Sequence, residues 1–207
     1  MSRFSEAERE RIRSALVEAG RELFAQFGFD RTRISDITEA VDIGTSTFYQ
    51  FFDSKEALYV EVLCVERDRL LAEIDEAVSE AESPREELRT MLETLLQEVR
   101  SNRLISRLII DDEIRGIQER FAESDSAADD DHHRTELSYA KQWAELEEFR
   151  FDDPAVVRSV IRSLIFITRA RDRSVAGPDQ DVPYEAIEAA IVDVVVAGFF
   201  DDGSASS

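Results

Sequence analysis

The chain has 207 residues, 43% of them apolar, which is enough for a real core in one large or two small domains. Its formal charge is -21, its single cysteine, Cys64, excludes an intramolecular disulfide, and neither a signal peptide nor an apolar run of about 18 residues appears. We therefore expect a globular cytoplasmic protein that makes no membrane contact.

Helix-forming residues dominate the composition. Glu, Ala, Leu and Arg are abundant, Gly and Pro number only 7 and 4, and no alternating apolar run has the length of a strand. This composition predicts an all-α fold.

The acidic charge lies mainly in the second part of the chain. Residues 1–55 hold 10 acidic against 8 basic residues, a net charge of -2, whereas residues 56–207 hold 36 against 17, a net charge of -19. Only Lys55 and Lys141 are lysines among the 25 basic residues. This bias resembles that of a halophilic cytosolic protein, in which carboxylates keep the surface hydrated at high salt; an ordinary acidic protein is the alternative.

The first predicted helix runs from Ser5 to Phe27, and Gly28 ends it in the left-handed position past its C-terminus. We expect it to cover the two short helices that follow and to close a three-helix core. Its apolar face is formed by Ile12, Leu16, Ala19, Leu23 and Phe27.

Two short helices separated by a tight turn are predicted between residues 34 and 52. The first buries a face at three- and four-residue spacing, and we expect Thr32 or Ser35 to cap it because Arg33 provides no cap. Asp42 tolerates the left-handed backbone of the turn, and Ile43 anchors the turn in the core. The buried face of the first helix consists of Ile34, Ile37, Ala40 and Val41.

The second short helix, from Gly44 to Gln50, begins with small hydroxyl residues and turns Phe48 inward with Phe51 and Phe52. A first helical turn with free amides, hydroxyl groups and a positive dipole end suits a phosphate or a base edge. The second helix of a helix-turn-helix enters the major groove of DNA in this way.

This part of the sequence resembles the DNA-binding domain of the TetR (tetracycline-repressor-like) transcriptional regulators, over roughly residues 8 to 62. The residues that carry the resemblance are Gly28-Phe29, Asp36-Ile37, Glu39-Ala40, Thr47-Phe48-Tyr49, Phe52 and Ser54-Lys55-Glu56-Ala57-Leu58. Three positions depart from the family pattern: Asp42 replaces a usual Gly, Arg33 a small hydroxyl residue, and Thr45 a frequent basic residue.

The resemblance implies a sequence-specific transcriptional regulator that binds double-stranded operator DNA. The residues expected to contact DNA are Arg33, Thr45, Ser46, Thr47, Tyr49 and Lys55. Lys55 corresponds to a phosphate contact of the family, and Arg33 with Arg31 would replace the charge absent at Thr45. The arginines at 3, 9, 11 and 13 have two open interpretations, as solvated charge or as contacts to the DNA backbone.

Asp53-Ser54 is expected to cap a long helix from Lys55 to about Ser83, and Ser83-Pro84 begins the next one. The residues expected to face inward in that next helix are Leu88, Met91, Leu92, Leu95, Leu96 and Val99. Further helices are predicted over 104–121 and up to about Phe149, on either side of a small acidic loop at 124–131. We place the domain boundary between residues 53 and 54, giving a helix-turn-helix domain at 1–53 and a helical ligand-binding and dimerisation domain at 54–207.

The last two predicted helices, 154–173 and 184–199, are apolar on more than one side. Faces this wide exceed the needs of a monomer core and indicate a partner surface. The resemblance implies that these helices pair across a two-fold axis into a four-helix bundle, so we expect a homodimer.

A ligand pocket is predicted between the head and the dimer helices. A soft Met and aromatic residues with polar tips suit an adaptable, mostly apolar cavity, but the same residues also fill ordinary bundle cores. The resemblance implies a repressor that a small molecule releases from DNA, and since no cluster of basic side chains converges among these positions, we expect that ligand to be apolar or amphipathic. The predicted lining residues are Met91, Leu95, Ile109, Tyr139, Trp143 and Phe166.

Other chemistry receives little support. His132-His133 beside three Asp residues lacks a spaced metal-ligand partner, and a buried position for Cys64 is more common than a redox role. Since no Gly-rich phosphate loop or nucleophile elbow is present, we expect neither an enzyme nor a cofactor. The alternative function is a dimeric helical ligand-binding or interaction protein that has lost DNA binding.

Overall fold

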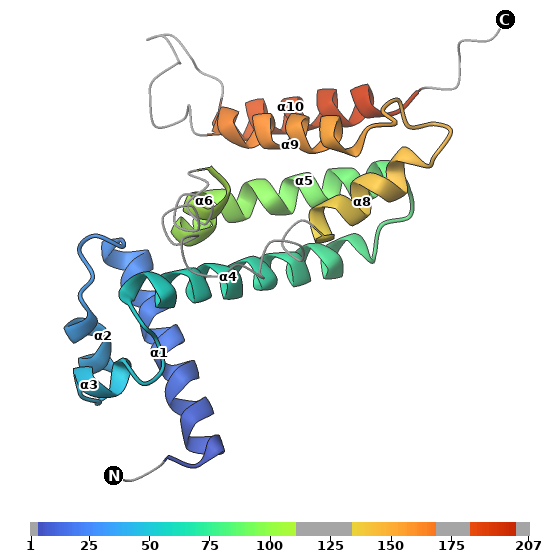
Figure 1. Cartoon of the computed structure of the whole chain (residues 1–207). Helices are drawn as coiled ribbons and strands as arrows, with labels where there is room; N and C mark the ends of the chain where they lie inside the picture. The colour runs from blue at the N-terminus through green and yellow to red at the C-terminus, as the bar shows by residue number, and fades with distance from the viewer. Residues whose placement is uncertain (1–3, 111–133, 169–182, 202–207) are drawn as a thin grey trace, which may run out of the picture. The chain divides into compact units, whose positions relative to one another are not determined.

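The computed structural model describes residues 4–110, 134–168 and 183–201 (Figure 1). Within these ranges the regular elements are all α-helices, and the only extended pairing is an isolated bridge between Phe149 and Phe200. The all-α prediction is confirmed. The chain divides into two compact units. The first consists of Met1–Arg69 and Asn102–Glu123, and the second of Leu70–Ser101 and Ser124–Ser207. The boundary between residues 53 and 54, which separates the expected DNA-binding domain from the expected ligand-binding and dimerisation domain, remains a prediction.

The first unit is built around the two short predicted helices. It contains α1 (Glu6–Phe27), α2 (Ile34–Ala40), α3 (Thr45–Phe48), the first part of α4 (Lys55–Val78) and α6 (Arg103–Ile110). One hydrophobic core joins all five elements, and its largest members are fully buried. They include Leu16, Phe24, Ile37, Phe48, Leu58, Tyr59, Leu63 and Leu104.

Local hydrogen bonds explain where α1 begins and ends. Ser5 and Glu8 form a capping box, in which the Glu8 amide donates to Ser5 Oγ at 3.3 Å and the Ser5 amide donates to Glu8 Oε2 at 2.8 Å. At the other end the Gly28 amide donates to the Phe24 carbonyl at 2.9 Å, and Gly28 has φ 84°. The prediction that Gly28 ends this helix with a positive φ is confirmed.

A buried carboxylate links three elements of the first unit. Glu66 of α4 is 3% exposed and accepts hydrogen bonds from Asn102 Nδ2 at 2.6 Å and from the Arg69 guanidinium at 2.9 Å. The Arg21 guanidinium of α1 lies 3.9 Å away. Asn102 Oδ1 in turn accepts the Leu104 amide at 3.0 Å, so the residue that caps α6 is itself held by Glu66.

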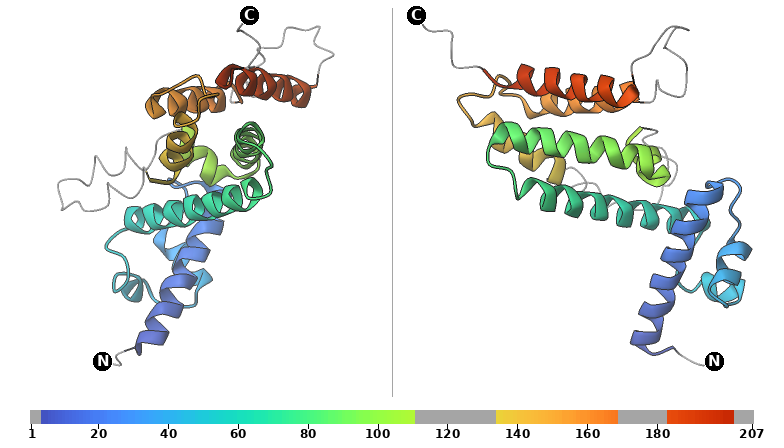
Figure 2. Two further views of the ribbon diagram at one scale, coloured as in Figure 1. Left: turned by 90° about the vertical axis from the view of Figure 1, so that its right-hand side faces the viewer. Right: turned by 180° about the vertical axis from the view of Figure 1, so that it is seen from behind.

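The second unit is a helical bundle. It contains the end of α4, α5 (Pro84–Ser101), α8 (Arg134–Ala144), α9 (Pro154–Thr168) and α10 (Tyr184–Phe199). Helices α9 and α10 both pack on α5, and α8 packs on α9 (Figure 2). The predicted inner face of α5 is confirmed, because its six apolar residues are all buried: Leu88, Met91, Leu92, Leu95, Leu96 and Val99.

Two helices end earlier than the sequence indicated. Helix α4 stops at Val78 rather than near Ser83, and α8 stops at Ala144 rather than near Phe149. After α8 the backbone turns and then pairs with the end of α10, where the Arg150 amide donates to the Phe199 carbonyl at 2.9 Å. This pairing, which no local pattern revealed, requires an extended backbone at Phe149.

The paired segments carry an aromatic cluster. The Phe149 ring stacks on Phe199 with centroids 5.5 Å apart and meets Phe200 edge-on at 5.2 Å. Trp143 adjoins Phe149 at 6.2 Å, and the Arg85 guanidinium lies 5.3 Å from the Phe200 ring centroid. The cluster fixes the C-terminal end of α10 to the segment between α8 and α9.

Candidate nucleic-acid interface

The turn between α2 and α3 has the backbone that the sequence predicted. Asp42 has φ 56°, the only positive φ of a non-glycine residue in the described parts of the chain. The Ile43 amide donates to the Thr38 carbonyl at 3.0 Å, which closes the turn. Ile43 itself packs against the core of the first unit, so α3 leaves the turn from a fixed point.

Helix α3 exposes one side and buries the other. Phe48 is fully buried, whereas Thr45 and Ser46 are exposed and Thr47 is half-buried. Tyr49 is 54% exposed, and its ring meets the Phe48 ring edge-on at 5.4 Å. Four of the predicted DNA contacts therefore come together on α3 and the residue that follows it.

The regular part of α3 is shorter than predicted, because it ends at Phe48 rather than Gln50. Tighter turns replace it: the Gln50 amide donates to the Thr47 carbonyl at 3.0 Å, and the Phe51 amide donates to the Phe48 carbonyl at 2.9 Å. These turns bring Phe51 and Phe52 back toward the core of the unit.

Lys55 is engaged by the protein itself. Its Nζ donates to the Phe29 carbonyl at 2.8 Å and to the Thr32 carbonyl at 2.9 Å, and it lies 4.1 Å from the centroid of the Phe29 ring. The ammonium therefore ties the loop after α1 to the first turn of α4. A lysine has three donors, so one remains for a phosphate, and that contact stays a prediction.

The expected cap of α2 was wrong. Thr32 is buried and its hydroxyl donates to the Gly28 carbonyl at 2.8 Å, while Ser35 Oγ lies 3.5 Å from the Asp36 carboxylate. Instead, Asp36 Oδ2 accepts the Arg33 amide at 2.9 Å. An acid in the first helical turn thus bonds the amide of the N-cap residue, while the Arg33 side chain provides no cap and stays exposed.

Three arginines of the first unit pair with carboxylates of the same unit, namely Arg13 with Glu61, Arg21 with Glu18 and Arg69 with Glu66. Arg21 donates to Glu18 at 2.5 Å and holds the pKa of that carboxyl below its usual value.

Burial raises the pKa of the Cys64 thiol, and the opposing effect of Arg67 is smaller. Cys64 therefore lacks the thiolate character that a redox sensor needs.

The predicted ligand-pocket residues are only partly brought together. Met91 and Leu95 are buried on α5, and Trp143 is buried on α8, where its Nε1 donates to Glu87 Oε2 at 3.0 Å. Tyr139 lies against Trp143 with ring centroids 5.8 Å apart and donates to Asp75 Oδ1 at 2.5 Å. The side chains of Ile109 and Phe166 lie outside the described residues, as do the acidic loop at 124–131 and the pair His132-His133.

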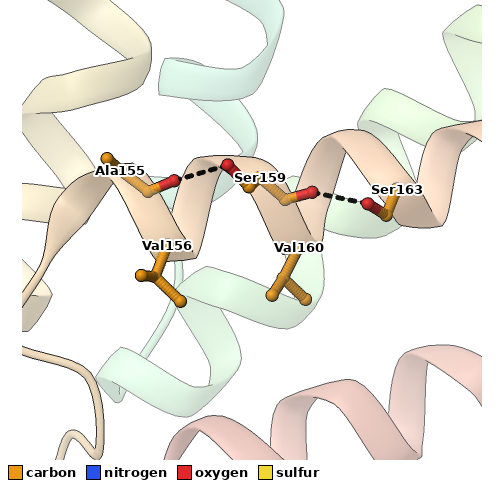
Figure 3. A pocket seen from close by; sticks show the side chains of 5 residues that line it. All are labelled: Ala155, Val156, Ser159, Val160 and Ser163. Atoms are coloured by element: carbon orange, nitrogen blue, oxygen red, sulfur yellow. Dashed lines mark hydrogen bonds between the residues drawn. The ribbon is translucent and has the colours of Figure 1, made fainter.

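Two apolar hollows lie on the surfaces of α9 and α10. The first is lined by Ala155, Val156, Ser159, Val160 and Ser163, and the second by Ala186, Ile187, Ala190, Ile191, Val194 and Val195. Figure 3 shows that Ser159 and Ser163 turn their hydroxyls onto the α9 backbone, each donating to the carbonyl four residues earlier at 2.8 Å. The hydroxyls are therefore satisfied within the helix, and the surface they leave is largely apolar.

In the described ranges no helix has the length and apolarity needed to cross a membrane. Across the same residues, no group of three or more His, Cys, Asp or Glu side chains is arranged to hold a metal ion.

Comparison with known protein sequences finds similarity in the helix-turn-helix region. Residues 16–62 match the family described as "Bacterial regulatory proteins, tetR family". The HTH-type transcriptional regulator RutR of Escherichia coli (strain K12) is 39% identical over 51 residues, which are 25% of this chain and 24% of RutR. The HTH-type transcriptional repressor DhaR of Mycobacterium sp. (strain GP1) is 38% identical over 52 residues, 25% of this chain and 26% of DhaR. The match therefore spans about a quarter of the length of these curated relatives.

The likeness in fold extends over nearly the whole chain. The crystal structure of RolR in complex with the ligand resorcinol superposes with a TM-score of 0.62 and 20% identity, covering 92% of this chain and 90% of RolR. At this identity the superposition shows the shared fold.

Proposed function

Because its helix-turn-helix region belongs to the TetR family of bacterial regulatory proteins, we propose that this chain binds double-stranded operator DNA and represses transcription until a small molecule releases it. The observation that carries the proposal is the exposed side of α3. Tyr49 is 54% exposed beside exposed Thr45 and Ser46, while Phe48 of the same helix is fully buried. An aromatic residue displayed on a firmly anchored short helix is suited to reading base edges in a major groove.

Charge supports a mechanism that depends on groove contacts. Residues 1–55, which include the helix-turn-helix, carry a net charge of only -2, whereas the whole chain carries a net charge of -21. Counterion release from phosphates weakens as salt rises, so base contacts and shape must supply much of the affinity if the protein works at high salt. Among the predicted contacts we assign Thr45, Ser46, Thr47 and Tyr49 to base or sugar edges, and Arg33 and Lys55 to phosphates.

The test is a gel shift with the DNA upstream of the chain's own gene, at low and high KCl. Tyr49→Phe should cost roughly 1–3 kcal/mol of discrimination for the operator over unrelated DNA. Arg33→Ala should weaken binding to all sequences alike and reduce the salt slope by about one. Lys55→Ala is a poorer probe because it also frees the Phe29 and Thr32 carbonyls. If Tyr49→Phe and Arg33→Ala both leave affinity unchanged, DNA is not bound through this surface.

We propose that α9 and α10 form the dimer interface. Val194 is 72% exposed and Val156 is 40% exposed, although the opposite sides of the same helices bury Val196 and Val157. Apolar surface on both sides of a helix favours a second partner, and the largest exposed patches of soluble proteins commonly mark interaction sites. Sedimentation at micromolar protein and high salt should give a dimer, whereas Val194→Glu should give a monomer; a wild-type monomer would rule the interface out.

A small apolar or amphipathic effector is the proposed inducer. RolR is a protein of the same fold with an aromatic ligand, resorcinol, in its crystal structure. In this chain Met91, Leu95, Tyr139 and Trp143 belong to one bundle and form the proposed lining, whereas Ile109 belongs to the other unit. Trp143 is the only tryptophan of the chain, so a change in tryptophan fluorescence reports on ligand binding beside this residue. Phenolic compounds should quench it and release DNA together; quenching without release would separate the pocket from regulation.

The competing function is a dimeric ligand-binding or interaction protein without DNA binding, which the charge of -21 favours. The same gel shift decides between the two. Absence of any shift at low KCl, with a folded dimer present, would support the alternative.

A further inference from the structure

Two arginines of α1 lie over the aromatic residues that follow α3. The Cζ atom of Arg9 is 5.1 Å from the centroid of the Phe51 ring, and the Cζ atom of Arg13 is 4.7 Å from the centroid of the Phe52 ring. Both distances are within the range of cation–π attraction. Arg9 and Arg13 are four residues apart and so share one face of α1, while Phe51 and Phe52 are adjacent.

Each arginine makes a second contact that fixes its direction. Arg9 NH2 donates to the Gln50 carbonyl at 3.4 Å, which lies in the turn directly after α3. Arg13 NH2 pairs with Glu61 Oε1 of α4 at 2.8 Å. The two guanidinium groups therefore connect α1 with the turn after α3 and with α4, which are both part of the same unit.

Helix α3 needs such support. It has only four residues, and Gly44 at its start has no side chain with which to cap it. A single helical turn is unstable in isolation, so the orientation of α3 depends on what holds its two ends. The Asp42 turn and Ile43 fix the first end; after Phe48, the contacts that hold the chain are those of Phe51, Phe52 and the Gln50 carbonyl.

We infer that Arg9 and Arg13 are positioning residues of the DNA-reading helix, which hold the turn after α3 against α1, and that they are not phosphate contacts. A guanidinium that left Phe51 for a phosphate would release the turn that orients Tyr49. Neither of the two interpretations of these arginines from sequence, solvated charge or contact to DNA, describes this arrangement. The inference rests on the proposed DNA-binding function for its effect on affinity, but the positioning itself is measurable without DNA.

The experiment compares Arg9→Ala and Arg9→Met with Arg11→Ala. Arg11 is exposed on the same helix, so its removal changes the charge equally and serves as the matched control. Hydrogen exchange is measured for the amides of Gln50, Phe51 and Phe52 in the DNA-free protein, and DNA affinity is measured against KCl concentration.

Both Arg9 variants should speed exchange of these amides about two- to five-fold, the loss expected for one exposed cation–π contact, and Arg11→Ala should not. Affinity for operator DNA should fall by a similar factor with an unchanged salt slope. Unchanged exchange in both Arg9 variants would overturn the inference, as would a salt slope reduced by about one, which marks a lost phosphate contact. If the wild type binds no DNA, the proposed function fails, while the exchange rates still decide whether Arg9 positions the turn.

Discussion

Glycine at position 28 is favoured by its backbone conformation. Its φ of 84° with ψ of 165° lies in a region that residues with a Cβ rarely adopt. A Cβ built there would lie 2.9 Å from NH2 of Arg107, on α6 of the same unit. Because this atom is the far end of a flexible side chain that can move aside, the backbone conformation is the main constraint on the residue at position 28.

We expect Gly28→Ala to lower the free energy of unfolding by about 1–3 kcal/mol, because alanine must accept this backbone and displace the Arg107 side chain. Gly198→Ala is the control, since nothing lies within 4 Å of a Cβ at that position and alanine favours the helix interior. Urea unfolding of both variants measures the difference. Equal stabilities would contradict the strain argued for Gly28.

Tyr139 provides a test of the second unit at high pH. Burial, and then the hydrogen bond to Asp75, raise the pKa of the Tyr139 phenol to about 12. The folded protein holds this proton more tightly than the unfolded chain, in which the pKa is about 10. The stability that results is fully present below pH 10 and is lost as the pH rises toward 12.

The expected observation is a tyrosinate absorbance titration with a step near pH 12 that belongs to Tyr139. Tyr139→Phe should remove one phenol from that step, and Asp75→Asn should move the Tyr139 step to lower pH because the neighbouring charge is gone. A step of unchanged amplitude near pH 12 in Tyr139→Phe would contradict the assignment.

Sequence reasoning succeeded at residues whose role is local. Asp42 was predicted in the left-handed turn and Gly28 at the end of α1, because backbone conformation limits the residues allowed there. It failed at Thr32 and was incomplete at Lys55, whose partners are carbonyls of a loop distant along the chain. A side-chain bond to a backbone carbonyl far along the chain, such as that of Lys55 to Phe29, leaves no local pattern in the sequence, so it required the structure.

Helices were predictable where one face is buried along their whole length. All six inward residues of α5 follow from a three- and four-residue spacing. The ends of α3 and α8 were not predictable, since α3 is shortened by turns that bring Phe51 and Phe52 to the core, and α8 by pairing of Phe149 with Phe200. In each case tertiary contacts outweigh the helical pattern.

A substitution of Glu66 tests whether the stabilities of α1, α4 and the start of α6 are linked. Glu66→Ala should lower the free energy of unfolding by about 1–3 kcal/mol, because it removes the buried acceptor of the half-buried Asn102 amide and of the Arg69 guanidinium. Asn102 would also hold the first amides of α6 less firmly. Hydrogen exchange of the Leu104 and Ile105 amides should therefore speed up in the same variant.

Glu93→Ala is the comparison, since Glu93 is 58% exposed and its pair with Arg89 spans 3.7 Å. We expect a loss below about 1 kcal/mol from this surface pair. A loss as small as this at Glu66 would mean that water replaces the carboxylate without penalty.

Because of its net charge, we expect the stability of the molecule and its proposed DNA binding to respond to salt in opposite directions. With a net charge of -21, the acidic side chains repel one another and destabilise the folded state. Raising the KCl concentration from about 0.1 to 1 M shortens the screening length from about 10 to 3 Å and so weakens this repulsion. The midpoint of thermal unfolding should rise by several degrees over this range, while affinity for DNA falls. A non-ionic solute at equal osmolality should reproduce little of the rise. A midpoint that falls steadily with KCl would contradict both the repulsion argument and the halophilic interpretation.

The bonded ammonium of Lys55 has a practical consequence for labelling chemistry. The chain offers amine-reactive reagents only two lysines besides its N-terminal amine. Lys55 Nζ is occupied by two carbonyls and the Phe29 ring, whereas Lys141 on α8 is exposed. Of the two lysines, dyes or cross-linkers should modify Lys141, two residues before Trp143, much faster than Lys55 in the native protein, and the difference should vanish on unfolding. The chain thus already carries one preferred lysine for attachment beside its only tryptophan.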